Sequence, residues 1–137
     1  MLTIYEARSG ALEAHKNPRR ITEQTVWIDL LNPKPAEETK IERALKIDVP
    51  TREEQQEIEA SSRLYQENGA QFMTATVLHQ TETSEPVATP ITFILAGNRL
   101  ITLRYAEPRT PSSVCAVRFA PVTLQNFVVD KARHGRY

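Results

Sequence analysis

An Asn-Gly pair between two β-compatible runs constrains the fold of this chain more than any other feature of its sequence. The pair is Asn68 and Gly69, and the flanking runs are residues 63–67 and 71–78. A tight hairpin turn needs residues that tolerate positive φ at its two central positions, and Asn followed by Gly meets this need best. The sequence therefore predicts an antiparallel pair of strands here, and a fold that contains a β-sheet.

A second strand–turn–strand pattern follows, and further strands are predicted nearer the N terminus. Residues 91–95 and 100–105 are rich in β-branched and apolar side chains on either side of a Gly-containing turn. Because both runs are densely apolar, we expect them in the middle of the sheet. Residues 25–31 form another dense β-branched and aromatic run. Residues 2–5 and 11–15 predict two shorter strands around a Gly turn.

Two segments between these strands predict helices. The first begins at Pro35, which suits an initial helical turn, and ends near Ile47. The second follows Pro50, where Thr51 and Glu54 have the spacing of a capping box. Two hairpins and a pair of helices indicate the α+β class, as a mixed β-sheet built from hairpins and flanked by two or more helices.

The length and character of the chain predict one folded domain followed by a tail. A chain of 137 residues has room for a single hydrophobic core. We assign residues 1–109 to the α+β domain. Residues 110–137 lose the regular patterns and become basic, and we treat them as a divergent tail whose structure the sequence does not define.

Composition and spacing argue against several functional classes. The 17 basic side chains balance 17 acidic ones, so no strong net field attracts nucleic acid. No apolar run approaches the about 20 residues of a membrane-spanning helix, and the first residues lack a secretory signal. We therefore expect a cytoplasmic location without membrane insertion. A single Cys, scattered His residues and isolated glycines also argue against an enzyme or an organic cofactor.

Carboxylates are concentrated on the two predicted helices. They are Glu37, Glu38 and Glu42 on the first, and Glu53, Glu54, Glu57 and Glu59 on the second. Hard cations such as Mg²⁺ prefer oxygen ligands and keep several waters, so one or two carboxylates at a subunit boundary can form a weak site. The same spacing fits a solvated helix face, and both interpretations stay open at this point.

The order of the motifs resembles the amino-terminal cytoplasmic domain of CorA-type magnesium transporters. The motifs are Trp27-Ile28-Asp29-Leu30 with Asn32-Pro33, a Glu-rich helix, Val49-Pro50-Thr51-Arg52-Glu53-Glu54, Ser62-Arg63-Leu64-Tyr65, Thr92-Phe93-Ile94-Leu95 and Leu100-Ile101-Thr102-Leu103-Arg104-Tyr105. The resemblance covers about residues 20–109. It implies a mixed sheet flanked by helices, at the cytoplasmic face of the bacterial inner membrane.

The resemblance also implies a regulatory Mg²⁺ site and a partner. Family members carry a regulatory Asp a few residues after a Pro that corresponds to Pro50, and the matching position here is Glu54, with Glu53 beside it. In that family, Mg²⁺ bound between the cytoplasmic domains of a homopentamer holds the channel closed. The implied partner is thus another copy of this chain or a full-length CorA-type transporter.

The resemblance does not extend to the parts of the family that conduct ions. The Gly-Met-Asn pore motif, the stalk helix and the membrane helices have no counterpart in these 137 residues. We therefore expect a regulatory domain of a magnesium (divalent metal cation) transporter that does not transport ions alone. On the strand at residues 25–31, we expect Trp27 to be a core anchor. We expect Asp29 to be a hydrogen-bond acceptor for the turn or the helix entry near Asn32.

Two other interpretations remain open. One is a stand-alone protein-interaction module that reaches its partner through the basic tail, residues 118–136. The other is a truncated gene product without a function of its own. Deletion of the tail tests the first of these: loss of partner capture with an unchanged response to Mg²⁺ would favour the interaction module.

Overall fold

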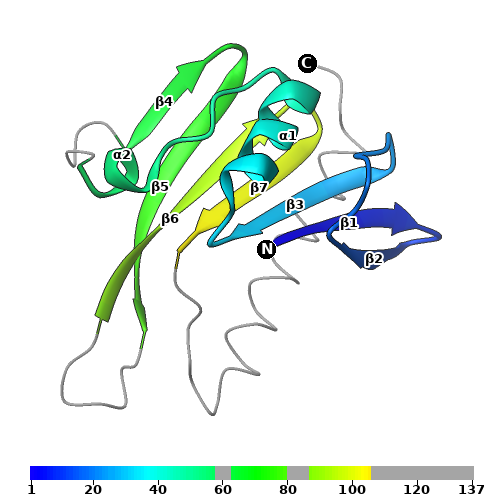
Figure 1. Cartoon of the computed structure of the whole chain (residues 1–137), viewed down its shortest axis with the longest axis horizontal. Helices are drawn as coiled ribbons and strands as arrows, with labels where there is room; N and C mark the ends of the chain where they lie inside the picture. Colours follow the sequence, from blue (N-terminus) through cyan, green and yellow to red (C-terminus); the bar gives the residue numbers. More distant parts are fainter. Residues whose placement is uncertain (58–62, 80–86, 106–137) are drawn as a thin grey trace.

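The computed structural model describes residues 1–57, 63–79 and 87–105, so the tail predicted at 110–137 lies outside the described residues. In chain order the elements are β1 (Leu2–Arg8), β2 (Ala11–Lys16), β3 (Thr25–Leu31), α1 (Pro35–Leu45), α2 (Arg52–Glu57), β4 (Leu64–Glu67), β5 (Ala70–His79), β6 (Val87–Ala96) and β7 (Arg99–Arg104). Both helices lie on the same face of one sheet (Figure 1). The predicted α+β class, with a mixed sheet flanked by helices, is confirmed.

The strands form one seven-stranded sheet in the order β2-β1-β3-β7-β6-β5-β4. Four of the pairings join consecutive strands, while β1 also pairs with β3. Among the described strands, β3 and β7 form the only parallel pair, with Trp27 opposite Leu100 and Leu31 opposite Arg104. This pair joins the three N-terminal strands to the four strands that follow the helices.

The predicted hairpins are confirmed, and the first has the expected turn chemistry. Asn68 and Gly69 both have positive φ, at 49° and 77°, between Glu67 and Ala70 of the paired strands. Positive φ at both central positions is what favours Asn-Gly over other residue pairs. In the second hairpin, Ala96 lies opposite Arg99, and β6 and β7 lie inside the sheet as predicted.

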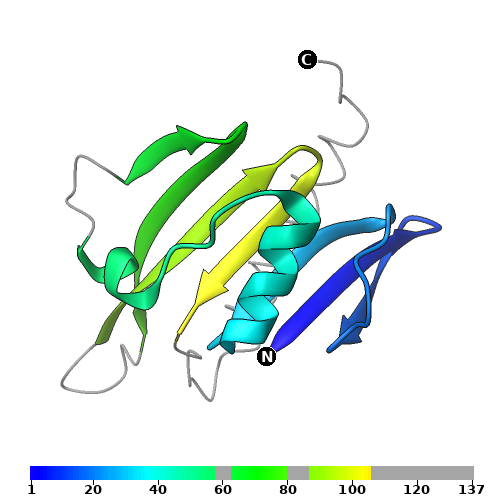
Figure 2. The same cartoon turned by 45° about the horizontal axis from the view of Figure 1, so that its top comes forward.

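The main core lies between the sheet and the helices. Its buried members are Leu2, Ile4, Ile28, Leu30, Ile41, Ile47, Val49, Ala70, Phe72, Ile94, Ile101 and Leu103. In each strand these side chains occur at every second position, which places them on one face. Figure 2 shows α1 in front of that face, where its buried residue, Ile41, is completely covered.

Helix α1 is attached to the sheet at its first turn. Glu37 accepts hydrogen bonds from the backbone nitrogen of Lys34 at 2.8 Å and from that of Leu2 at 3.1 Å. One carboxylate thus caps the helix and binds the start of β1. No helix in the described residues is long and apolar enough to cross a membrane.

A polar group links strands β3 and β7 on the opposite face of the sheet. Trp27 stacks on Tyr5 at 4.1 Å between ring centroids and is buried, which confirms it as a core anchor. Its indole nitrogen donates to Thr102 Oγ1 at 3.1 Å, and that hydroxyl donates to Asp29 Oδ1 at 2.7 Å. Arg104 completes the group, with its guanidinium 2.8 Å from Asp29 Oδ2.

Asp29 therefore accepts from Thr102 and Arg104 and not from the turn or the helix entry near Asn32, so that prediction is wrong. The residue lies in the middle of β3 and is buried, with its side chain directed to β7. Its partner Arg104 lies 75 residues away in the sequence, so local spacing contained no sign of the ion pair.

We expect Asp29→Asn to destabilise the fold by about 2 kcal/mol, because hydrogen bonds to charged groups contribute about 1.5 to 3 kcal/mol. The Arg104 side chain is 25% exposed, so water recovers part of the loss, and the cost stays below that of a fully buried pair. Urea unfolding followed by circular dichroism measures the change. Asp48→Asn, at an exposed position, is the matched control and should cost less than about 0.5 kcal/mol. Equal effects of the two substitutions would contradict a stabilising role for the ion pair.

Candidate functional site

The predicted capping box at the start of α2 is confirmed and positions one of the two predicted site residues. Glu54 Oε2 accepts from the backbone nitrogen of Thr51 at 2.8 Å, and Thr51 Oγ1 accepts from the nitrogen of Glu54 at 3.2 Å. Glu53 and Glu54 are both exposed. The box uses one carboxylate oxygen of Glu54, which leaves the other for solvent or a cation.

Helix α2 is held on the sheet by a polar side chain that sequence reasoning missed. Gln55 is 3% exposed, and its Nε2 donates to Thr92 Oγ1 at 2.8 Å and to the Leu103 carbonyl at 3.1 Å. Thr92 in turn lies 2.9 Å from the hydroxyl of Thr74. Gln55 Oε1 is buried and has no hydrogen-bond partner in the described part of the protein. Gln55 stands in a run of polar and acidic residues, so the sequence pattern carries no signal that it is buried.

Tyr105 lies close to carboxylates from both helices. Its hydroxyl donates to Glu38 Oε1 on α1 at 3.4 Å, and the Arg52 guanidinium of α2 lies 5.5 Å from its ring centroid. Burial, the charge of Glu38, its hydrogen bond and the charge of Glu53 raise the pKa of Tyr105 to about 12, although Arg52 opposes the shift. One carboxylate from each helix, Glu38 of α1 and Glu53 of α2, therefore acts on Tyr105.

Glu38 belongs to the same negative region. Burial raises the pKa of the Glu38 carboxyl, and the charges of Glu42 and Glu37 raise it further, while the hydrogen bond from Tyr105 opposes the shift. Repulsion among carboxylates of this kind falls when a cation binds nearby. A cation bound in this region would therefore reduce the repulsion among these carboxylates.

The donor set limits what kind of cation site is possible. No three His, Cys, Asp or Glu side chains within the described ranges are grouped so that they could hold a metal ion. Glu53 and Glu54 still fit Mg²⁺, because this ion is commonly bound through one or two carboxylates and keeps several waters. Its other ligands would come from water or another chain. Glu59, also on the predicted acidic helix, lies outside the described residues.

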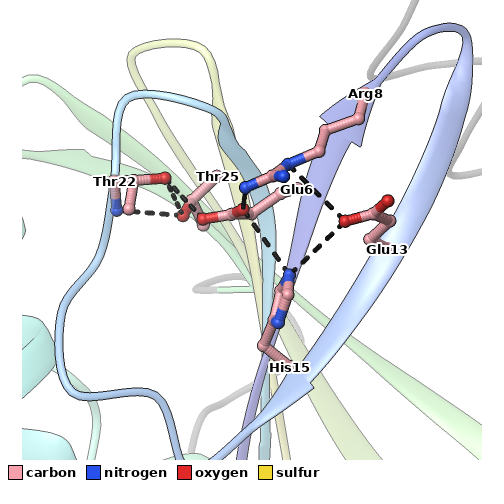
Figure 3. Close-up of polar contacts among 6 residues, drawn as sticks. All are labelled: Glu6, Arg8, Glu13, His15, Thr22 and Thr25. Atoms are coloured by element: carbon pink, nitrogen blue, oxygen red, sulfur yellow. Dashed lines mark hydrogen bonds and ion pairs between the residues drawn. The ribbon is translucent and has the colours of Figure 1, made fainter.

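A second polar cluster lies at the N-terminal edge of the sheet and was not predicted (Figure 3). The buried carboxylate of Glu6 accepts from Thr22 Oγ1 at 2.6 Å and from Arg8 at 3.1 Å, and His15 Nε2 lies 3.5 Å away. Arg8 also lies 3.5 Å from Glu13. A register shift between Tyr5 and Glu6 interrupts the pairing of β1 with β3, which breaks the alternation that sequence patterns rely on.

The Glu6 cluster fixes the loop between β2 and β3. The hydrogen bond from Thr22 lowers the pKa of the Glu6 carboxyl, burial opposes this effect, and Arg8 and His15 lower the pKa further. The charged form of Glu6 is therefore favoured in the folded protein. We interpret the cluster as structural, since its side chains bind one another.

Comparisons with known proteins relate this fold to magnesium transporters. A family model described as CorA-like Mg²⁺ transporter protein matches residues 22–118. The magnesium transport protein CorA of Wolinella succinogenes is 31% identical over an alignment of 119 residues, and the match covers 80% of this chain and 37% of that protein. CorA of Campylobacter jejuni strain RM1221 is also 31% identical over an alignment of 119 residues, and that match covers 78% of this chain and 36% of the relative. The chain thus spans little more than a third of these curated relatives.

Solved structures support the same fold. The soluble domain of CorA from Methanocaldococcus jannaschii superimposes with a TM-score of 0.58 at 13% identity, covering 90% of this chain and 46% of the other. The complete CorA magnesium transporter of that organism gives a TM-score of 0.54 at 13% identity and covers 90% and 38%. At this level of identity the likeness shows a shared fold.

We expect Tyr105 to remain a phenol at about pH 11, where an ordinary tyrosine is about nine-tenths ionised. Its pKa of about 12 predicts that Tyr105→Phe removes little of the tyrosinate absorbance at that pH. Glu38→Gln removes a charge and a charged acceptor, so it should lower the pKa of Tyr105. In that background, Tyr105→Phe should remove a larger share of the absorbance. Equal shares in the two backgrounds would show that Glu38 does not act on Tyr105.

We expect the Glu6 cluster to make stability depend on pH in the acid range. The pKa of Glu6 is lowered in the folded state, so its stabilising contribution is present above the ordinary pKa of about 4.5 and is lost as the pH falls through the folded value. Glu6→Gln should flatten the decline in the urea midpoint between about pH 6 and pH 3. Glu13→Gln, at an exposed position, should change this slope less. A larger change of the slope with Glu13→Gln than with Glu6→Gln would contradict the assignment of the pH dependence to Glu6.

Proposed function

The chain belongs to the family of CorA-like Mg²⁺ transporters, and on this premise we propose that its α+β domain senses Mg²⁺ and regulates assembly instead of conducting ions. The carboxylates that α1 and α2 bring to one region around Tyr105 carry this proposal. The family match over residues 22–118 supports it, together with the fold that the chain shares with the soluble domain of CorA.

The proposed ligands are Glu53 and Glu54. Both side chains are exposed, and the capping box holds Glu54 at the start of α2 while one of its oxygens stays available. Mg²⁺ bound here would keep several waters, so the site would be weak, in the millimolar range. Such a cation would supply positive charge to a region where the carboxylates repel one another.

The proposed consequence of Mg²⁺ binding is association with a second chain. Two copies that approach each other through this negative region repel, and a shared cation between them removes that repulsion. The second chain would supply the ligands that the described residues of one chain lack. The proposed partner is another copy of this chain or a full-length CorA-type transporter at the cytoplasmic face of the membrane.

We expect millimolar Mg²⁺ to raise the sedimentation coefficient of the wild-type chain, because the cation bridges negative regions of two copies. Glu53→Gln/Glu54→Gln should abolish this response. Glu13→Gln/Glu67→Gln removes the same number of charges at exposed sites on β2 and β4, and it should keep the response. NaCl at the same ionic strength controls for general screening.

Three results would contradict this proposal. The first is a sedimentation coefficient that Mg²⁺ does not change, together with no capture by a full-length CorA-type transporter. The second is an equal response to NaCl, which would make the effect one of screening alone. The third is an unchanged response in Glu53→Gln/Glu54→Gln, which would place the cation at other residues.

A further inference from the structure

A basic groove lies between helix α1 and the loop that connects β2 to β3. It has a volume of about 660 Å³, and its lining includes the four cationic side chains Arg19, Arg20, Lys40 and Arg43. Ile21 and Ala44 contribute apolar surface. Pockets that hold small molecules have volumes of about 300 to 1,000 Å³, so this groove is large enough for one.

Two separate segments build the groove and are joined to each other. Lys40 and Arg43 lie three residues apart on α1, which places them on the same side of the helix. Arg19 and Arg20 come from the loop, which runs beside α1 in Figure 2. The Lys40 ammonium donates a hydrogen bond to the Pro18 carbonyl and so connects the loop to the helix. This hydrogen bond holds the backbone of the loop beside α1, so the exposed side chains of Arg19, Arg20 and Arg43 share one surface with Lys40.

The positive charge of the groove is not neutralised within the described residues. No carboxylate lines the groove, and Arg19, Arg20 and Arg43 form no ion pair in the described part. The carboxylates of α1 are directed elsewhere, as shown by Glu42, which accepts from the Val49 nitrogen at 3.1 Å. Since the whole chain has a formal net charge of zero, this concentration of cations is a local feature.

We propose that this groove binds a multiply charged phosphate-bearing anion. Guanidinium groups match the geometry of phosphate oxygens and bind them through two parallel hydrogen bonds, and a nearby ammonium adds a point charge. The small and apolar side chains beside them leave room for the part of the ligand that carries the phosphate. The groove does not include Glu53 or Glu54, so this proposal is independent of the Mg²⁺ site.

Inorganic tripolyphosphate is the first probe, titrated calorimetrically into the intact chain at low ionic strength with a chelator present. We expect saturable binding that weakens about tenfold in Arg20→Ala and in Arg43→Ala, because each loses a charge-assisted hydrogen bond to phosphate. Arg63→Ala is the matched control. It removes an exposed arginine next to β4, at the opposite edge of the sheet, and should change affinity less than about twofold.

A second pair of measurements separates the groove from general attraction and identifies the source of the phosphate. Ala44→Trp fills the groove without a change of charge, so it should abolish specific binding while circular dichroism shows an intact fold. Vesicles containing phosphatidylglycerol, compared with neutral phosphatidylcholine vesicles, test a lipid headgroup as the source. Binding to either probe that depends on Arg20, Arg43 and Ala44 supports the proposal. Absence of binding to both probes, or equal losses in Arg63→Ala and Arg43→Ala, overturns it.

Discussion

The parallel pairing of β3 with β7 is the constraint on which the rest of this structure depends. It joins β2, β1 and β3 to the four strands that follow the helices, and it is the only parallel pair among the described strands. The ion pair between Asp29 and Arg104 and the hydrogen bonds through Thr102 connect the same two strands with side chains. Both helices lie in the segment between β3 and β4, so the position of α1 over the sheet requires this junction.

The parts of the fold that could be predicted are those set by neighbouring residues. The turn at Asn68 and Gly69 depends on the φ values of these two residues, and the capping box depends on Thr51 and Glu54, which lie three positions apart. Such features are formed by contacts within one segment, so their pattern is present in the sequence. The α+β class followed from them.

The features that escaped prediction involve residues from distant segments or a local irregularity. Asp29 meets Arg104 only after β7 returns beside β3. Gln55 can be buried because Thr92 and the Leu103 carbonyl, both on the sheet, accept hydrogen bonds from its amide nitrogen. At Glu6, the register shift interrupts the alternation from which burial is inferred. For the candidate cation site, the resemblance indicated Glu53 and Glu54. The connection to Glu38 through Tyr105 could be seen only in the structure, because the three segments are far apart in the sequence.

The way in which α2 is attached distinguishes it from α1. Helix α1 is anchored by the apolar side chain of Ile41, and water offers no substitute for that contact. Among the described side chains of α2, the buried one is Gln55, whose two hydrogen bonds water can replace and whose Oε1 would gain a partner on release. By this comparison of Ile41 with Gln55, the free energy needed to separate α2 from the sheet is lower than that for α1. A change of charge at the carboxylates of α2 therefore acts on the less firmly attached of the two helices.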